Sequence, residues 1–345
     1  MRSRDVERVR RAIRAAAIRL PDVFAAGTRL VVAFSGGQDS TCLLHALAHA
    51  HRKLDLLAVH VDHGLRPDSA ESAQRVSDAA RTIGVRCEVV RVEVAKRGSV
   101  QQAARVARYA ALAAAAQAHD AKAILVAHTA DDQAETLLLN LLRGTGLLGL
   151  AGMRMDEVRA ARLVRPLLDV SRSTTLAYCT HFGLLSTIVE DASNQTRVYT
   201  RNRVRLDLLP LLREFNPAVH EVLSRMADLV AEDLEVLDAL ASDLYTTLQN
   251  DGTYDLRAFR AQPRALQRRL LRLGLQHAGL SLKNVADRPL EDALNLLQTG
   301  QPNQTYHLPY GVEVCIGHQT FVLRQHGNAR APSARNTWES VGSRV

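Results

Sequence analysis

The sequence predicts an α/β protein: a Rossmann-like parallel sheet with helices on both faces, followed by a connector helix and a small α+β domain. Three observations predict this architecture. Through the first half of the chain, short apolar runs typical of buried strands alternate with longer helical stretches. A loop rich in glycine and serine directly follows the first apolar run. From about residue 216, a long and partly acidic helical pattern replaces the alternation.

The expected elements of the first half follow one another as strand and helix. A basic amphipathic helix over residues 1–20 comes first, and four pairs follow: strand 30–34 with helix 40–51, strand 54–61 with helix 69–83, strand 87–92 with helix 100–119, and strand 123–127 with helix 131–143. Right-handed crossovers join such units into a parallel sheet that is covered on both faces. Ligands of these sheets bind at the carboxyl ends of the strands, so polar motifs found there are the candidate site residues.

We expect four segments along the chain: a catalytic domain over residues 1–215, a connector helix over 216–250, a small α+β domain over 251–324, and a polar tail over 325–345. The small domain ends in a predicted hairpin over 312–323. Pro263 is placed to start a helix in this domain. Leucines and arginines should occupy different faces of that helix, with Leu266, Leu270 and Leu273 on one face and Arg264, Arg268 and Arg272 on the other.

Composition excludes several classes of protein. Hydrophobic residues make up 47% of the chain and charged residues 23%, as in an ordinary globular protein. No stretch approaches the ~18 apolar residues of a membrane span, and residues 1–20 lack a signal-peptide pattern, so we expect a cytoplasmic protein without a membrane partner. The four cysteines form no C-x-x-C pair, which gives no zinc or redox signature. The net charge of +8 favours a polyanionic partner only weakly.

The loop after the first strand has the sequence S-G-G-Q-D-S. Two glycines let the backbone approach phosphate oxygens, and the following helix N-terminus offers free N–H groups. Because no G-K-[ST] follows, the loop is not a P-loop, and it is suited to holding the pyrophosphate of ATP while chemistry occurs at the α-phosphate. A plain glycine-serine turn is the alternative. The expected ATP-binding residues are Ser35, Gly36, Gly37, Gln38, Asp39 and Ser40, with Asp39 also placing Mg²⁺.

A second motif, A-H-T-A-D-D-Q-A-E-T over residues 127–136, opens the helix after the fourth strand. Asp131 and Asp132 lie in the first turn, where a carboxylate also stabilises the helix end. Capping can explain one of the two. The other can hold Mg²⁺ or the ammonium group of an amine substrate, and we favour Asp132 for this role.

A third cluster, H-V-D-H-G-L-R over residues 60–66, follows the second strand. Together with His128 and the two aspartates it could form a two-metal phosphohydrolase site. We disfavour this alternative because His60 lies within the strand, where such side chains are usually structural. Arg105 and Arg108 share one face of a later helix, and contact with phosphate and pairing with an acid remain equal alternatives.

Two arginine-rich stretches in the second half are divided by an acidic segment. They are either solvated helix faces or two contact points for one long polyanion. The first stretch contains Arg197, Arg201, Arg203, Arg205 and Arg213, and the second contains Arg257, Arg260, Arg264, Arg268, Arg269 and Arg272.

The ordered set of motifs resembles the tRNA(Ile)-lysidine synthetase family of N-type ATP pyrophosphatases, the PP-loop superfamily. Besides the three motifs above, it includes A-R-V-A-R-Y, R-G-T-G-L-L-G-L-A-G-M and E-D-A-S-N-Q-T-R-V-Y-T-R-N-R-V-R. The resemblance covers about residues 29–217. It implies that ATP adenylates C2 of the wobble cytidine in an isoleucine tRNA with a CAU anticodon. Free L-lysine then displaces AMP to form lysidine, which changes decoding from AUG to AUA.

The resemblance also implies roles for particular residues. Asp39, Asp132, Arg108 and Arg105 are the expected catalytic residues. The resemblance implies contacts near the active site and tRNA at Asn194, Tyr199, Arg201, Asn202 and Arg205. The residue patterns described above add Asp131 and the arginines Arg264, Arg268 and Arg272 as expected contacts to tRNA or to another substrate. The chain ends where longer family members carry a second C-terminal domain, and we expect that domain to be absent. A homodimer is possible. The alternatives are a tRNA-thiolating relative, which the scattered cysteines fit poorly, and a nucleic-acid-binding module with an inactive nucleotide loop.

Overall fold

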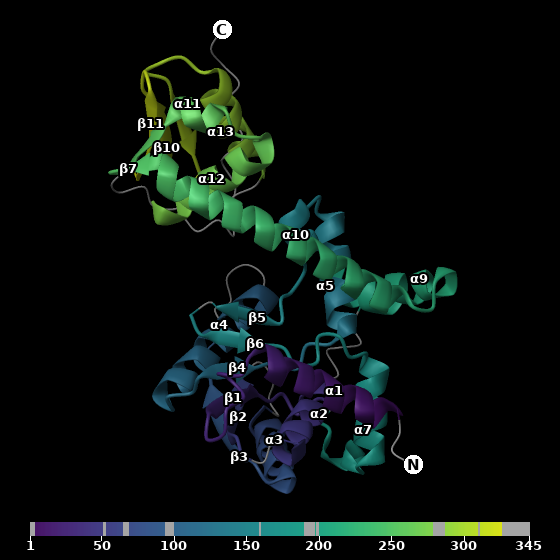
Figure 1. Cartoon of the computed structure of the whole chain (residues 1–345). Coiled ribbons are helices and arrows are strands. Elements are labelled where there is room, and N and C mark those ends of the chain that lie inside the picture. The colour runs from purple at the N-terminus through teal and green to yellow at the C-terminus, as the bar shows by residue number, and fades with distance from the viewer. Residues whose placement is uncertain are drawn as a thin grey trace. The chain divides into compact units, whose positions relative to one another are not determined.

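A computed structural model describes residues 4–50, 53–64, 69–93, 100–158, 160–189, 197, 200–278, 287–309 and 311–325 of the chain. The chain forms two compact units, Met1–Ala231 and Glu232–Val345. The boundary between them falls inside one long helix, α10 (Val219–Leu248), which is visible in Figure 1. No helix among the described residues is both long and apolar enough to span a bilayer.

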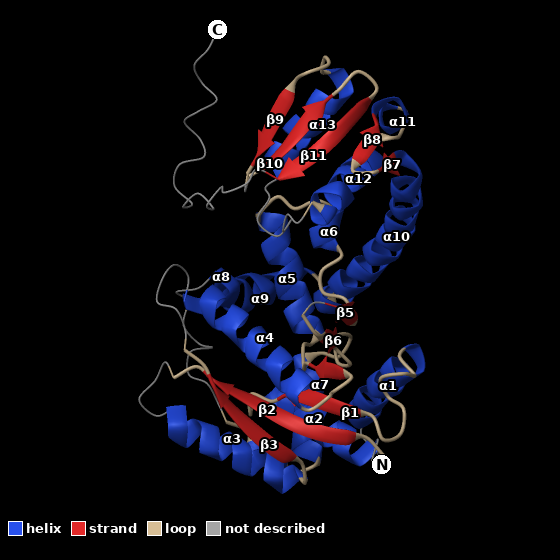
Figure 2. Ribbon diagram, turned by 90° about the vertical axis from the view of Figure 1, so that its left-hand side faces the viewer, coloured by secondary structure: helices blue, strands red, loops and turns tan. Residues whose placement is uncertain are grey.

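The first unit is built on a six-stranded sheet with the order β3-β2-β1-β4-β6-β5 (Figure 2). All neighbouring strands pair in parallel except β5, which is antiparallel to β6. The predicted parallel sheet is therefore confirmed, with an antiparallel edge strand added. The strands are β1 (Arg29–Ala33), β2 (Asp55–Asp62), β3 (Arg86–Arg91), β4 (Ala123–Leu125), β5 (Asp156–Val158) and β6 (Arg162–Val164).

Helices cover both faces of this sheet, as predicted. Side chains of β1 alternate between the two faces: Leu30 and Val32 belong to one core cluster and Val31 to another. The first cluster includes side chains of α1 (Arg4–Arg19), α2 (Gln38–Ala50), α3 (Ser69–Ile83) and α7 (Arg172–His181). The second cluster is closed by α4 (Val100–Ala118).

Sequence periodicity located the first four strand–helix pairs to within a few residues but missed the β5–β6 hairpin and α7. The hairpin strands are only three residues long and carry charged residues, so no apolar run marks them. Helix α7 contains three threonines, which have low helix propensity. Its start is fixed by Ser171, whose hydroxyl accepts a hydrogen bond from the Thr174 amide at 3.3 Å.

Beyond the sheet, a series of short helices packs on α5 (Ala130–Leu142). They are α8 (Thr200–Arg203), a π-helical turn over Val204–Leu208, and α9 (Leu209–Phe215). Ala134 and Leu138 of α5 share a core cluster with Val204 and Leu209. This packing holds Arg201, Arg205 and Arg213 of the first arginine-rich stretch opposite the N-terminal half of α5. The short helix α6 (Leu147–Leu150) follows α5, and a 3₁₀ turn over Leu184–Thr187 follows α7.

The second unit contains an antiparallel sheet with the order β7-β8-β11-β10-β9, the C-terminal part of α10, and the helices α11, α12 and α13. The predicted terminal hairpin is confirmed as β10 and β11. Helix α12 buries a different face from the one predicted: Leu270 is buried, but Leu266 and Leu273 are only partly so. The elements are β7 (Gln249–Asn250), β8 (Thr253–Asp255), α11 (Leu256–Arg260), α12 (Arg264–His277), α13 (Asp287–Thr299), β9 (Thr305–Leu308), β10 (Val312–Ile316) and β11 (Thr320–Gln325).

Candidate active site

The candidate site lies where the strand order of the first sheet reverses. From β1, the chain proceeds through β2 and β3 to one edge, and β4 then pairs with the other side of β1. In open α/β sheets, the crevice at such a reversal is the expected ligand site. The loop over residues 35–40 follows β1, and the residues that open α5 follow β4. The two strongest motifs therefore meet at this crevice.

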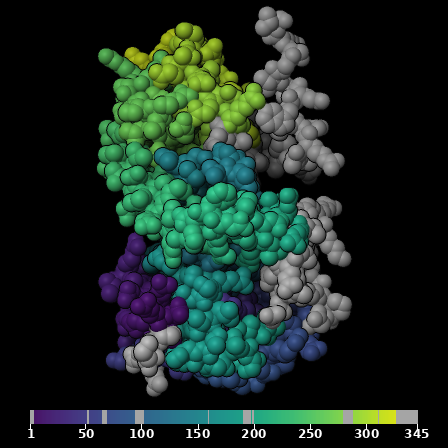
Figure 3. Space-filling view, turned by 90° about the vertical axis from the view of Figure 1, so that its right-hand side faces the viewer, coloured from purple at the N-terminus to yellow at the C-terminus, as the bar shows by residue number. Residues whose placement is uncertain are grey.

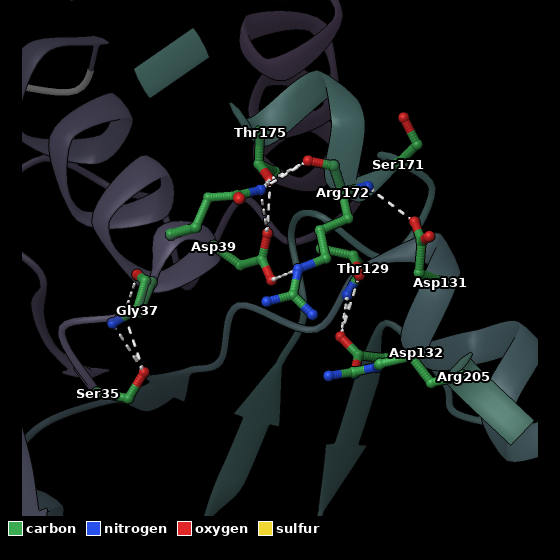
Figure 4. A network of polar contacts seen from close by, with 12 residues as sticks. Ser35, Gly37, Asp39, Thr129, Asp131, Asp132, Ser171, Arg172, Thr175 and Arg205 are labelled. Carbon is green, nitrogen blue, oxygen red and sulfur yellow. Dashed lines mark hydrogen bonds and ion pairs between the residues drawn. The ribbon is translucent and has the colours of Figure 1, made fainter. Parts of the chain in front are cut away.

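The loop after β1 is a tight turn that only glycine can make. Gly36 has a φ of +76°, and a Cβ atom there would lie 2.7 Å from Val76 Cγ2. The Gly37 amide donates to Ser35 Oγ at 3.3 Å (Figure 4). The Ser40 hydroxyl donates to the Gly37 carbonyl at 2.9 Å. The loop leads directly into the N-terminus of α2, whose amide groups and dipole favour an anion. The geometry is that of a phosphate-binding turn.

Asp39 is held in the crevice with little compensating charge. The Thr175 hydroxyl hydrogen-bonds its Oδ1, and Arg172 Nε lies 3.7 Å from its Oδ2 (Figure 4). Burial raises the pKa of Asp39 to about 6, an effect that Thr175 and Arg172 only partly oppose and that the nearby Asp132 and Asp131 increase. An ionised Asp39 therefore favours the arrival of a cation.

Helix α7, which the sequence did not reveal, forms one wall of the site. The Gln38 amide nitrogen donates to the Arg172 carbonyl at 2.6 Å and to Thr175 Oγ1 at 2.7 Å. Arg172 and Thr175 therefore position both Gln38 and Asp39. No local signal in the sequence assigns them to the site, because only tertiary packing brings α7 against the start of α2.

Asp131 uses both carboxylate oxygens to connect structural elements. Its Oδ2 accepts a hydrogen bond at 2.7 Å from the backbone amide of Arg172, in the first turn of α7. Its Oδ1 accepts from Arg213 Nη2 at 3.1 Å and lies 3.4 Å from His220 Nε2. The sequence predicts a substrate contact for Asp131, which stays a prediction; in the structure its carboxylate joins α5, α7 and α9.

Asp132 faces arginines as well as its own helix end. Its Oδ2 accepts from the backbone N–H and the hydroxyl of Thr129, both at 3.0 Å, which caps α5. Its Oδ1 lies 3.2 Å from Arg201 Nη2 and 3.4 Å from Arg205 Nη2. Burial alone would raise the pKa of Asp132, but the charges of Arg201 and Arg205 and the hydrogen bond from the Thr129 amide lower it overall. Asp132 is therefore ionised.

Glu135 completes this network, and sequence reasoning missed it. Its side chain is fully buried, accepts a hydrogen bond from Arg201 Nε at 2.8 Å, and accepts a second from Arg205 Nε. A signal was present, because a spacing of three places Asp132 and Glu135 on one helix face and a spacing of four does the same for Arg201 and Arg205. Arg205 lies in the π-helical turn over Val204–Leu208, and such turns are often found at functional sites.

His128 is held as a neutral side chain beside this network. Arg165 is fully buried. It donates from Nε to His128 Nδ1 at 3.1 Å and from Nη2 to Glu157 at 2.9 Å. Burial lowers the pKa of His128 to about 3; Asp132 opposes this shift, and the charges of Arg165, Arg105 and Arg201 add to it. Because Nδ1 accepts from Arg165, the ring proton is on Nε2, which is a neutral hydrogen-bond donor.

The helix α4 arginines lie close to the same region. The guanidinium group of Arg108 contacts His63 Nε2 at 3.3–3.4 Å, and Arg105 lies over the Tyr109 ring at 5.2 Å from its centroid. The positive charge of Arg105 helps to keep the pKa of His128 low. Both arginines are exposed, which leaves them accessible to an anionic ligand.

The cluster after β2 uses most of its polar atoms for local structure. His60 Nδ1 lies 3.0 Å from the Phe34 carbonyl oxygen, and Asp62 Oδ1 accepts from the Gly64 amide at 2.9 Å. Within the described ranges, no group of three or more His, Cys, Asp or Glu side chains is arranged to hold a metal. A cation bound at Asp39 would therefore need further ligands from the substrate.

The other predicted contact residues fall into three groups. Asn202 lies in α8, partly buried, between the two network arginines in sequence. Asn194 and Tyr199 lie outside the described residues. In the second unit, Arg264 Nη2 and Arg268 Nε bind the two carboxylate oxygens of Glu291 at 3.0 and 2.6 Å, and Arg272 is partly buried on the same helix. These two arginines therefore join α12 to α13.

The glycine turn, the strand order and the acidic start of α5 together define a PP-loop protein, and a family profile described as "PP-loop domain" matches residues 7–212. Similar proteins show to which family of PP-loop proteins the chain belongs. The tRNA(Ile)-lysidine synthase of Salinispora tropica is 44% identical over 90% of this chain and 93% of its own length. That of Thermosynechococcus vestitus is 39% identical over 84% and 85%. The chain belongs to the tRNA(Ile)-lysidine synthase family.

A longer relative and a solved structure extend this comparison. The tRNA(Ile)-lysidine synthase of Geobacillus kaustophilus is 34% identical, and the match covers 84% of this chain but 65% of that protein. The U34-tRNA thiolase NcsA of Methanococcus maripaludis superimposes with a TM-score of 0.57 at 16% identity, over 66% of this chain and 79% of that one. At this level of identity the likeness shows a shared fold.

Proposed function

We propose that this protein joins lysine to C2 of the wobble cytidine in an isoleucine tRNA with a CAU anticodon, using ATP, and so forms lysidine in the cytoplasm. The observation that carries the proposal is the pairing of two features at one crevice. A phosphate-binding turn lies beside Asp39, a carboxylate whose negative charge is poorly compensated. An acidic pair, Asp132 and Glu135, lies next to them. The first feature suits ATP, and the second suits the ammonium group of lysine.

The turn over residues 35–40 binds the β- and γ-phosphates through the amides at the start of α2 and the loop hydroxyls. Asp39 is placed to share Mg²⁺ with the phosphates, since Mg²⁺ typically takes one or two carboxylates together with phosphate oxygens. The raised pKa of Asp39 fits this role, because a cation would replace the positive charge that the site lacks. Bound Mg²⁺ would supply charge neutralisation for the departing pyrophosphate.

The reaction has two steps, and in each step one bond to the attacked atom forms and one breaks. The C2 carbonyl oxygen of the cytidine attacks the α-phosphorus of ATP, and the bond to the pyrophosphate oxygen breaks. The ε-amine of lysine then attacks C2 and releases a proton, and AMP leaves with the former carbonyl oxygen. Arg105 and Arg108 are exposed near the site and can contact the phosphate charge that develops. Adenylation thereby turns an unreactive carbonyl oxygen into a leaving group.

The acidic pair on α5 is the proposed site for the lysine ammonium group. Asp132 and Glu135 now bind the guanidinium groups of Arg201 and Arg205. These arginines occupy the positions that an ammonium group would take. Lysine binding therefore requires that at least one guanidinium group moves, and an arriving tRNA phosphate is a suitable partner for it.

A thiolating activity fits the cysteines less well. Cys42 and Cys179 are fully buried, and burial raises the pKa of Cys42 well above its ordinary value. Burial also raises the pKa of Cys87 to about 11. Thiol groups in this state are poor nucleophiles and poor carriers of sulfur.

Incubation with ATP, Mg²⁺, lysine and a CAU-anticodon isoleucine tRNA transcript, followed by nucleoside mass spectrometry, tests the proposal. We expect a nucleoside with the mass of lysidine, formed with one AMP and one pyrophosphate. Parallel reactions with radioactive lysine and with a radioactive sulfur donor separate ligation from thiolation. Sulfur incorporation, or tRNA binding with no release of AMP, would contradict it.

A further inference from the structure

Helix α1 carries a row of arginines that the chemistry described so far does not use. Four apolar residues, Val6, Val9, Ile13 and Ala16, pack one face of α1 into the core of the first unit. On a helix with 3.6 residues per turn, Arg4, Arg8 and Arg11 lie together on the opposite face. All three side chains are exposed.

Two other arginines of the same helix, Arg10 and Arg14, have neighbours that account for them. Arg14 pairs with Glu7 on one flank of the helix. Arg10 lies close enough to His45 and Tyr178 for its charge to act on both side chains. Arg19 lies in the last turn, where the helix dipole favours a positive charge. Within the described part of the chain, Arg4, Arg8 and Arg11 have no such partner.

This arrangement is unfavourable for the helix by itself. Arg4 and Arg8 are four residues apart and Arg8 and Arg11 are three apart, so each pair brings like charges together on adjacent turns. In the first turn the charge of Arg4 is offset by Asp5 and Glu7. An external polyanion would remove the repulsion between the arginines of the row.

The row begins beside a wall of the active site. Helix α1 packs along α7, as Figures 1 and 3 show, and Asp5 Oδ1 lies 3.4 Å from Thr174 Oγ1 in the first turn of α7. The same turn contains Arg172 and Thr175, which contact Asp39. A strand of RNA whose base enters the crevice at Asp39 would therefore pass close to the N-terminal end of α1.

We propose that Arg4, Arg8 and Arg11 form a phosphate-binding row for the RNA strand that flanks the modified base. The proposal rests on the proposed function, since it takes the substrate to be a tRNA. The three guanidinium groups are spread over about 10 Å of helix, at about 1.5 Å per residue. Contacts of this kind position the RNA and carry no sequence information.

The test compares two triple variants that lose the same charge. The first is Arg4→Gln/Arg8→Gln/Arg11→Gln. The matched control is Arg75→Gln/Arg81→Gln/Arg86→Gln, which removes three exposed arginines from α3 and β3 of the same unit. A third variant, Arg4→Lys/Arg8→Lys/Arg11→Lys, keeps the charge. Circular dichroism should show the native helix content in all three, since glutamine and lysine are both good helix formers.

The measured quantity is the affinity for a fluorescent RNA hairpin with the anticodon stem and loop, from about 50 to about 300 mM KCl. We expect the first variant to bind at least about tenfold more weakly at about 100 mM, with a log–log salt slope smaller by about 2–3. Its kcat should be unchanged and its KM for RNA raised. The lysine variant should keep most of the slope, and the control should lose much less affinity.

Equal losses in the α1 variant and the control would show that only overall charge matters, and would overturn the proposal. So would wild-type affinity and slope in the α1 variant, because α1 would then be a solvated face. The binding measurement does not depend on turnover, so an inactive wild-type enzyme would contradict the proposed function alone. An active wild-type enzyme with an unaffected α1 variant would contradict this inference alone.

Discussion

Substitution of Asp39 by asparagine should stabilise the protein at neutral pH while abolishing its activity. Asp39 is buried beside Asp131 and Asp132, and these surroundings raise its pKa from 3.8 to about 6. At neutral pH the carboxylate is nevertheless ionised, and its charge costs folding free energy. Asparagine has nearly the same shape, can still accept the hydrogen bond from Thr175, and carries no charge.

The magnitude follows from the pKa. At about 1.4 kcal/mol per pKa unit, a rise from 3.8 to about 6 means that ionised Asp39 destabilises the folded state by about 3 kcal/mol. Below about pH 4 the carboxyl group is protonated in both states, so the wild type and the variant should be equally stable. Between about pH 4 and 6 the unfolded chain has lost the proton that the folded chain keeps, so wild-type stability falls as the pH rises. Above about pH 6 the full difference in stability between the variant and the wild type persists.

Urea unfolding followed by circular dichroism, from about pH 4.5 to 8 without Mg²⁺, measures this gap. In thermal unfolding, 3 kcal/mol corresponds to about 6–12 °C for a unit of this size. Asp62→Asn is the matched control, because Asp62 is another buried aspartate, with a hydrogen bond from the Gly64 amide, and should show no such gain. A variant no more stable than wild type at pH 7.5, or a gap equally large at pH 4.5, would refute the reasoning.

Three further predictions follow from the charged networks. Asp132→Asn keeps the cap on α5 but removes the charge proposed to bind lysine. Incorporation of radioactive lysine should therefore fall at least about a hundredfold. Near-normal turnover would exclude that role for Asp132. Glu135→Gln leaves two guanidinium groups without their buried partner and should lower the urea-unfolding free energy by about 3–5 kcal/mol, and a loss below about 0.5 kcal/mol would contradict the buried network. Arg264→Gln/Arg268→Gln should weaken tRNA binding and reduce its salt dependence. The matched variant Glu291→Gln should do neither. Unchanged affinity in the double variant would mean that these arginines only join α12 to α13.

Much of the first unit was predictable because its signals are local. The strand–loop–helix pattern around residues 30–50 and the rule for ligand sites in parallel sheets together located Ser35, Asp39 and Asp132 at one crevice. Each of these residues directly follows a strand or opens a helix. Sequence reasoning therefore found the ends of elements where chemistry is expected.

The rest of the site depends on contacts between distant segments. Glu135 is read from the sequence as an ordinary helix residue, and only packing against Arg201 and Arg205 shows that it is buried. Arg165 is likewise a fully buried charge that no local pattern distinguishes from an exposed one. Helix α7 was missed because threonines weaken its periodic signal.

The arginine-rich stretch of the second unit also depends on contacts that the sequence does not reveal. Its density suggested either a solvated helix face or a contact point for a polyanion. The structure instead pairs Arg264 and Arg268 with Glu291, and Arg260 Nε donates to the Leu297 carbonyl at 2.8 Å near the end of α13. The acceptors lie some way along the chain, so a count of charges within one stretch could not reveal them.

The central claim is that the cytidine base, and not lysine, is the group that ATP adenylates. A CAU-anticodon transcript with ¹⁸O at C2 of the wobble cytidine tests this directly, by mass spectrometry of the AMP released during lysine incorporation. If the C2 oxygen attacks the α-phosphorus, that oxygen leaves with AMP, and we expect one ¹⁸O atom in AMP for each lysidine formed. Unlabelled AMP, with lysine still incorporated, would show that the C2 oxygen does not attack the α-phosphorus and would contradict the account.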